Sequence, residues 1–158
     1  MGVHYNPGDI VLGNWTLSEL IGEGSFGSVF RAKRKDFGRT YESAIKIITI
    51  PKNQSELVSA KADGMDEDSV KAYFHTFVDE LVDEISLMSK LKGNSNVVSY
   101  EDHTVIQRTD RIGWDIIIRM ELLTPLLEYT HKEKLKKKTL CNWALICATL
   151  WRFVRSTI

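Results

Sequence analysis

A cluster of glycines between two alternating segments restricts the fold of this chain more than any other feature of its sequence. Apolar and polar side chains alternate in residues 15–21 and again in residues 28–34, and Gly22, Gly24 and Gly27 lie between them. Alternation with a period of two is typical of β-strands, and glycines permit the tight turn that joins two strands. We therefore predict a β-hairpin with a glycine-rich tip.

Three further segments have the composition of strands. Residues 43–50 are mostly apolar and rich in isoleucine, and they end before Pro51. Residues 97–107 and 114–122 flank a polar turn that contains a glycine. Isoleucine and other β-branched residues favour strands, and proline, glycine and polar residues mark their ends. With the hairpin, these segments predict an antiparallel sheet of five strands.

One long helix is predicted over residues 73–91. Its apolar side chains recur every three or four residues, which places them on one face of a helix: Phe77, Leu81, Ile85 and Met88. The polar connection at residues 52–72 is long enough to hold an additional helix, and Thr124 with Pro125 predicts the start of a short one. The predicted class is therefore α+β, with the sheet packed on the long helix.

The glycine run can do more than turn the chain. Residues 22–29 read G-x-G-x-x-G-x-V, and glycines allow backbone N–H groups to approach phosphate oxygens closely. A dinucleotide-binding turn has similar glycines but leads into a helix, whereas a strand follows here. A glycine-rich hairpin without any ligand is the remaining alternative.

A lysine lies inside the apolar strand at residues 43–50. Lys46 is flanked by isoleucines, and burying its amine is costly unless an anion accompanies it. Glu84 can supply that anion, because it lies at the edge of the apolar face of the predicted helix and has no cation four residues further on. Glu80, one turn earlier, is the rival partner.

These motifs, in this order and spacing, resemble the N-lobe of Ser/Thr protein kinases. The resemblance rests on GEGSFGSV, AIK, DEISLMSKLKGNSNVV and IIIRMELL and covers residues 13–130, and residues 131–158 are an atypical tail. It implies a kinase-like N-lobe with the beginning of the C-lobe helices. It also implies that ATP is the ligand and that phosphoryl transfer to protein Ser or Thr hydroxyls is the reaction of a full-length parent.

The resemblance also implies a role for each residue of the site. The glycines would cover the ATP phosphates, Lys46 would hold two of the phosphates and pair with Glu84, and Val29 and Ala44 would enclose the adenine. Met120 would be the gatekeeper, and the backbone of the next residues would bind the adenine edge. Met88 and Tyr100 would belong to the apolar stack that couples the helix to the active state. The implied nucleotide-binding residues are Ile21, Gly22, Glu23, Gly24, Ser25, Phe26, Gly27, Val29, Ala44, Lys46, Met120, Glu121 and Leu123.

The motifs that perform the transfer do not follow the hinge in this sequence. There is no HRD loop, and the one DFG, at residues 36–38, precedes the lysine strand in a predicted hairpin turn, so we do not expect it to bind metal. We therefore predict no metal site and no catalysis by this chain alone, with Mg²⁺ needed only in a full-length parent. The alternative is a non-catalytic, pseudokinase-like module for nucleotide binding or protein interaction.

Composition bears on partners and location. The 21 basic and 21 acidic side chains give a net charge of zero, so nucleic acid is not an expected partner. With only two cysteines and no signal pattern at the N-terminus, the sequence predicts a cytoplasmic protein. Without a C-lobe, the exposed cleft surface is expected to favour self-association or docking on another kinase.

The tail does not continue the resemblance. Residues 140–154 are apolar, but as a helix they would span about 22 Å, short of the ~30 Å thickness of a bilayer core, so we do not expect a membrane span. A start of the first long C-lobe helix is a second interpretation. Our third hypothesis is a shift of reading frame near residues 136–138, which the nucleotide sequence of the gene would test.

Overall fold

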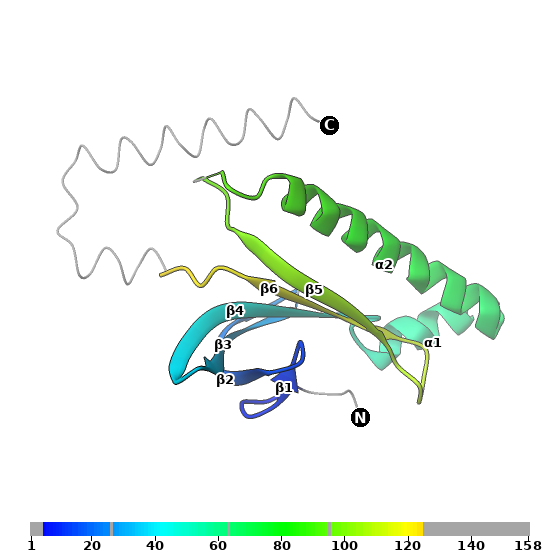
Figure 1. Ribbon diagram of the computed structural model, residues 1–158. Helices are drawn as coiled ribbons and strands as arrows, with labels where there is room; N and C mark the ends of the chain where they lie inside the picture. The colour runs from blue at the N-terminus through cyan, green and yellow to red at the C-terminus, as the bar shows by residue number, and fades with distance from the viewer. Residues whose placement is uncertain (1–4, 26, 63, 95, 125–158) are drawn as a thin grey trace, which may run out of the picture.

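The structure, a computed structural model, describes residues 5–25, 27–62, 64–94 and 96–124. These residues form one curved antiparallel sheet of six strands in the order β1-β2-β3-β4-β6-β5, with two helices (Figure 1). Along the chain the elements are β1 (Ile10–Val11), β2 (Trp15–Gly24), β3 (Gly27–Asp36), β4 (Arg39–Ile50), α1 (Gln54–Ala62), α2 (Glu67–Lys90), β5 (Tyr100–Gln107) and β6 (Trp114–Met120).

The prediction of five strands was wrong by one. The five predicted strands are present, and β2 to β4 form the expected glycine-tipped hairpin and its neighbour. The sixth strand is β1, which pairs with the start of β2 through Ile10 opposite Thr16 and Val11 opposite Trp15. Two residues are too few to show any periodicity, and for this reason β1 could not be predicted from the sequence.

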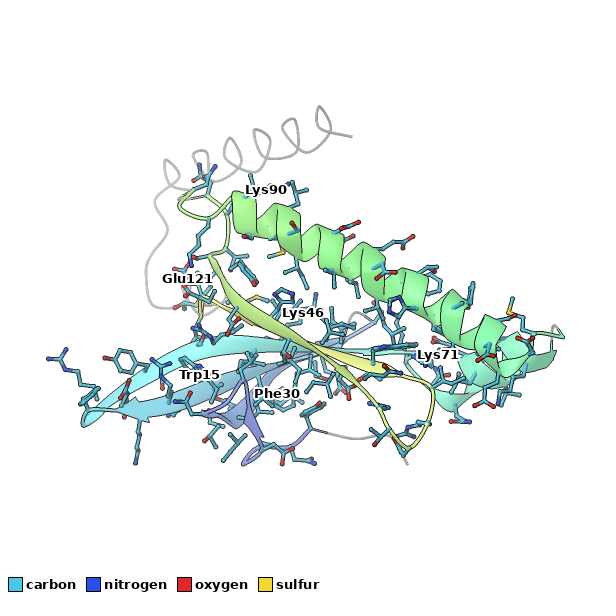
Figure 2. The ribbon with its side chains drawn as sticks, turned by 45° about the vertical axis from the view of Figure 1, so that its right-hand side comes forward. Trp15, Phe30, Lys46, Lys71, Lys90 and Glu121 are labelled. Atoms are coloured by element: carbon cyan, nitrogen blue, oxygen red, sulfur yellow. The ribbon has the colours of Figure 1, made fainter. Side chains whose placement is uncertain are left out.

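The two faces of the sheet carry two separate cores. One face packs under α1 and α2 and contains Ile48, Ile50, Ile116 and Ile118. The opposite face is covered by the N-terminal residues and contains Trp15, Phe30, Ile45, Ile47 and Ile117. Burial of each such isoleucine contributes about 1.5–3 kcal/mol. Figure 2 shows Trp15 and Phe30 on the side of the sheet away from α2.

Helix α2 begins six residues before the predicted start, at Glu67 rather than at Tyr73. Asp66 is its N-cap, and the side chain of Asp66 accepts a hydrogen bond from the backbone N–H of Ser69 at 2.7 Å. This hydrogen bond holds the pKa of Asp66 below its ordinary value. The predicted range missed the polar first turn, in which a cap rather than an apolar side chain fixes the helix.

The buried stripe of α2 also differs from the predicted one. Phe77 was expected in the core, but it is 38% exposed. The buried side chains of α2 are Val70, Phe74, Val78 and Ile85. The first half of α2 packs through Phe74 and Val78, and Phe77 turns outward against the edge of the Tyr73 ring, 5.1 Å away between centroids.

The expected long connection at residues 52–72 contains α1, so the sheet is accompanied by two helices and not by one. Leu57 and Ala60 of α1 are buried in the same core as α2. The predicted short helix from Pro125, the beginning of the C-lobe helices and the tail at residues 131–158 lie outside the described residues.

A buried polar cluster ties the N-terminal residues and the β5–β6 turn to the sheet. Asp115 on β6 is 2% exposed and accepts two hydrogen bonds from Arg108, at 3.1 and 2.7 Å. Thr49 donates to the same carboxylate at 2.8 Å, and the Tyr5 hydroxyl donates to it at 3.4 Å. Burial and the neighbouring Asp115 carboxylate raise the pKa of Tyr5 to about 12.

Candidate functional site

The strand register brings several predicted site residues into one row across the sheet. Val29 on β3 lies opposite Lys46 on β4, and Lys46 lies opposite Ile118 on β6. Ala44 lies opposite Met120. In a strand, residues two apart share a face, so Ala44 and Lys46 lie on the same face as the buried Ile48, toward α2. Figure 2 shows Lys46 on this side of the sheet.

The glycine hairpin continues this surface at the edge of the row. Gly22 lies opposite Val29, and Gly24 lies opposite Gly27, so the strands stay paired to the tip. Gly27 has a φ of 103°, and a Cβ atom there would overlap the carbonyl oxygen of Ile47. Only glycine fits this close approach to β4. Ile21 and Glu23 are exposed, as is Ser25 at the tip, and Phe26 lies outside the described residues.

The expected pair of Lys46 and Glu84 is not formed in this structure. Lys46 is partly buried, Glu84 and its rival Glu80 are exposed, and no ion pair joins Lys46 to either acid in the described part of the chain. Glu84 does lie where the sequence placed it, directly before the buried Ile85 at the edge of the stripe that faces the sheet. The pairing therefore stays a prediction.

The backbone at the end of β6 and just after it forms only some of its possible hydrogen bonds. The N–H of Glu121 donates to the Ser99 carbonyl at 2.9 Å, and the carbonyl of Met120 accepts from the Ser43 hydroxyl at 2.7 Å. Among the described residues, no hydrogen bond engages the Glu121 carbonyl or the N–H of Leu123. One acceptor and one donor therefore have no partner within the described part of residues 5–124 at the end of the row, where Figure 2 shows Glu121.

Tyr100 packs beside this row. Tyr100 is on β5, lies opposite Met120 of β6, and contacts the core under α2. Its hydroxyl forms a hydrogen bond of 2.7 Å with Nδ1 of His103. Burial, and then the charge of Asp102, raise the pKa of Tyr100. Met88 on α2 is half-buried, and the coupling role expected for Met88 and Tyr100 stays a prediction.

The early DFG lies in the hairpin turn between β3 and β4, as expected. Asp36 pairs with Arg39 across the turn, Phe37 is fully exposed with a φ of 46°, and Gly38 has a φ of 73°. In the part of the chain that the structure describes, no three His, Cys, Asp or Glu side chains come together as metal ligands do. Nor does any helix among these residues have the length and apolar character needed to cross a membrane.

Sequence reasoning missed a cavity of about 630 Å³ beside the tip of the glycine hairpin. Its walls come from Tyr5, the glycine tip, residues 47–54 and the β5–β6 turn, and they include Arg108 and Arg111. No sequence signal indicated it, because its walls come from segments far apart in the chain.

Comparison with known proteins gives one distant kinase similarity. No family model matches the chain. The chain is 25% identical over 141 residues to the serine/threonine-protein kinase AKL1 of Saccharomyces cerevisiae, and this alignment covers 85% of the chain. It covers 12% of the yeast kinase, so the chain spans about an eighth of that protein's length. The similarity supports a distant relationship to Ser/Thr kinases.

Proposed function

We propose that this chain is the ATP-binding part of a Ser/Thr protein kinase. The observation that carries the proposal is the row of Val29, Lys46, Ala44 and Met120 on one face of the sheet, with the glycine hairpin at its edge. The six-stranded sheet packed on α2 is compatible with a kinase N-lobe, and the distant similarity to a yeast Ser/Thr kinase favours the same assignment.

In this proposal each part of the row has one task. The amine of Lys46 neutralises phosphate oxygens, and the N–H groups near Gly22 and Gly24 donate to them. Val29 and Ala44 contact the faces of the adenine ring. The Glu121 carbonyl and the Leu123 N–H, which have no partner among the described residues, bind its edge. Glu84 pairs with Lys46 when α2 moves closer to the sheet.

Catalysis requires groups that this sequence does not carry. A base for the substrate hydroxyl and two Mg²⁺-binding side chains would belong to a C-lobe, and positioning with charge neutralisation supplies most of the acceleration of phosphoryl transfer. We therefore assign protein Ser/Thr phosphorylation to a longer parent, and place that parent in the cytoplasm. Nucleic acid is not a proposed partner.

The test is ATP binding by calorimetry, with Lys46→Met and Lys35→Met compared. Lys35 is an exposed lysine on β3, so its variant controls for the loss of one positive charge. Loss of a charge-assisted hydrogen bond costs about 1.5–3 kcal/mol, which predicts roughly 10- to 150-fold weaker binding for Lys46→Met alone. Equal ATP affinity in the two variants would refute the site.

A second candidate function is docking on another protein, and the outer surface of α2 favours it. Tyr73 is 44% exposed and Phe77 is 38% exposed, and their rings contact each other edge to face. Exposed aromatic pairs of this kind are common in protein interfaces. Sedimentation of the wild type and of Tyr73→Ser with Phe77→Ser separates the candidates. Self-association lost in the double variant would support docking, and a monomeric wild type would remove this argument.

A further inference from the structure

The cavity beside the glycine tip shares Glu23, Gly24, Ser25 and Gly27 with the proposed nucleotide surface, and its other walls are different. Its wall from β4 consists of Ile47, Ile48 and Thr49, and it includes neither Lys46 nor Ala44. Val29 and Met120 are also absent from its walls. The cavity is instead closed by the β5–β6 turn and by the start of α1. Its volume, about 630 Å³, is in the usual range for sites of small organic ligands.

Positive charge lines this cavity from two segments. Lys52 comes from the connection after β4, and Arg108 and Arg111 come from the β5–β6 turn, against a single acid, Glu23. The charge of Arg108 is already balanced, because Asp115 holds it at 2.7 Å. Of the two arginines, Arg111 is the less closely paired, because its acid, Asp110, lies 3.6 Å away.

Arg111 has hydrogen-bonding capacity that the described residues leave unused. Its Nε and Nη2 atoms are buried and have no hydrogen-bond partner in the described part of the chain. The nearest acid is Asp110, 3.6 Å from Nε, and the Asp110 side chain is 65% exposed. The Arg111 side chain as a whole is 22% exposed and lines the cavity, so an anion in the cavity can pair with the accessible part of this guanidinium.

The remaining walls combine polar side chains, such as Ser28, Asn53 and Gln54, with an apolar part. Phe30, Ile47, Leu57 and Ile112 contribute to this apolar part, and Tyr5 adds an aromatic ring. A bare inorganic anion would leave most of this surface and volume unfilled. An anionic group joined to an apolar ring would satisfy both kinds of wall, and the planar fork of arginine suits a phosphate.

We propose that this cavity binds an aromatic phosphate monoester, with the phosphate on Arg111 and the ring against Phe30 and Leu57. The site is independent of the proposed ATP site, although both adjoin the glycine hairpin. A ligand here contacts the hairpin tip through Gly24 and Ser25, so its binding would restrict the tip.

The test is a two-dimensional NMR titration of the full chain with phenyl phosphate, with phenol and inorganic phosphate as separate controls. The amide signals of Ser25, Asn53 and Ile112 should shift with phenyl phosphate more than with either control, while those of Lys46 and Met120 stay in place. Shifts centred on Lys46 and Met120, or no shift at millimolar phenyl phosphate, would overturn the proposal.

Two variants test the anion contact. Arg111→Gln should bind phenyl phosphate about tenfold more weakly, since it loses a charge-assisted contact. Arg39→Gln, which removes an exposed charge at the β3–β4 turn, should change the affinity less than twofold. Unchanged affinity for phenyl phosphate in a folded Arg111→Gln variant would overturn the proposal. If that variant does not fold, the amide shifts of the wild-type chain in the titration with phenyl phosphate decide the proposal.

Free aromatic phosphates and phosphotyrosine side chains share this chemistry. Titration with an acetylated and amidated phosphotyrosine tripeptide separates the two sources. Tighter binding of the tripeptide than of phenyl phosphate identifies a phosphorylated chain, and weaker binding identifies a small molecule. In a parallel ATP titration, Lys46→Met should affect only ATP, and Arg111→Gln should affect only phenyl phosphate, so the two proposed sites can fail separately.

Discussion

Replacing Asp115 by asparagine tests whether the buried polar cluster stabilises the face of the sheet that lies away from α2. The carboxylate is 2% exposed, and Arg108, whose side chain is 8% exposed, donates two hydrogen bonds to it. The substitution leaves the Arg108 guanidinium buried without its counter-ion. Removal of one partner from such a pair typically costs about 3–5 kcal/mol.

The exposed acid of the same turn supplies a matched control. Asp110 carries the same charge, but its side chain is 65% exposed and lies 3.6 Å from Arg111. Exposed pairs contribute about 0–1 kcal/mol, so Asp110→Asn should change stability little. Urea unfolding, followed by the fluorescence of the buried Trp114, gives the free energy of unfolding of each variant.

The stability losses of Asp115→Asn and Asp110→Asn together test whether Asp115 and Arg108 act as a buried pair. If Asp115→Asn and Asp110→Asn lose similar stability, the cluster does not behave as a buried pair and the reasoning fails. The double variant Asp115→Asn with Arg108→Leu should recover most of the loss, because it removes the uncompensated charge. A double variant less stable than Asp115→Asn alone would show that Arg108 stabilises the turn by other contacts.

Three further predictions concern stability. Gly27→Ala should lower the free energy of unfolding in urea by about 1–3 kcal/mol, because the φ of 103° is strained for alanine and the added Cβ meets the Ile47 carbonyl. An unchanged midpoint of urea unfolding would contradict this packing. Phe74→Ala should cost about 3–5 kcal/mol of unfolding free energy and Phe77→Ala roughly 1 kcal/mol, because Phe74 is 5% exposed and Phe77 is 38% exposed. Equal losses in the two variants would contradict the orientation of α2. The pKa of Tyr5 is raised to about 12, so the folded state favours the neutral phenol. The stability that this preference contributes is complete below pH 10 and should fall as the pH rises from 10 to 12. Tyr5→Phe should reduce that fall.

The parts of the fold that depend on periodicity could be predicted from the sequence. The glycine-tipped hairpin and the isoleucine-rich strand appeared where expected, because the alternation in each is long enough to read. The early start of α2 could not be predicted, since its first turn is fixed by Asp66 and carries few apolar side chains.

The candidate site could be predicted as a set of residues, but its geometry could not. Register, which joins Lys46 to Val29 on one side and to Ile118 on the other, is a property of the folded sheet. The distance between Lys46 and Glu84 depends on how closely α2 approaches the sheet, and no local pattern in the sequence determines that. The cavity near Arg111 depends on contacts between distant segments, so it had no local signal either.

The most direct test of the central claim is an NMR titration of the full chain with ATP. The account predicts that the amide signals of Gly22, Val29, Lys46 and Leu123 shift together with one dissociation constant, and that Lys46→Met weakens all of these shifts. The absence of shifts at millimolar ATP, or shifts confined to the turn that holds Arg108 and Arg111, would contradict it.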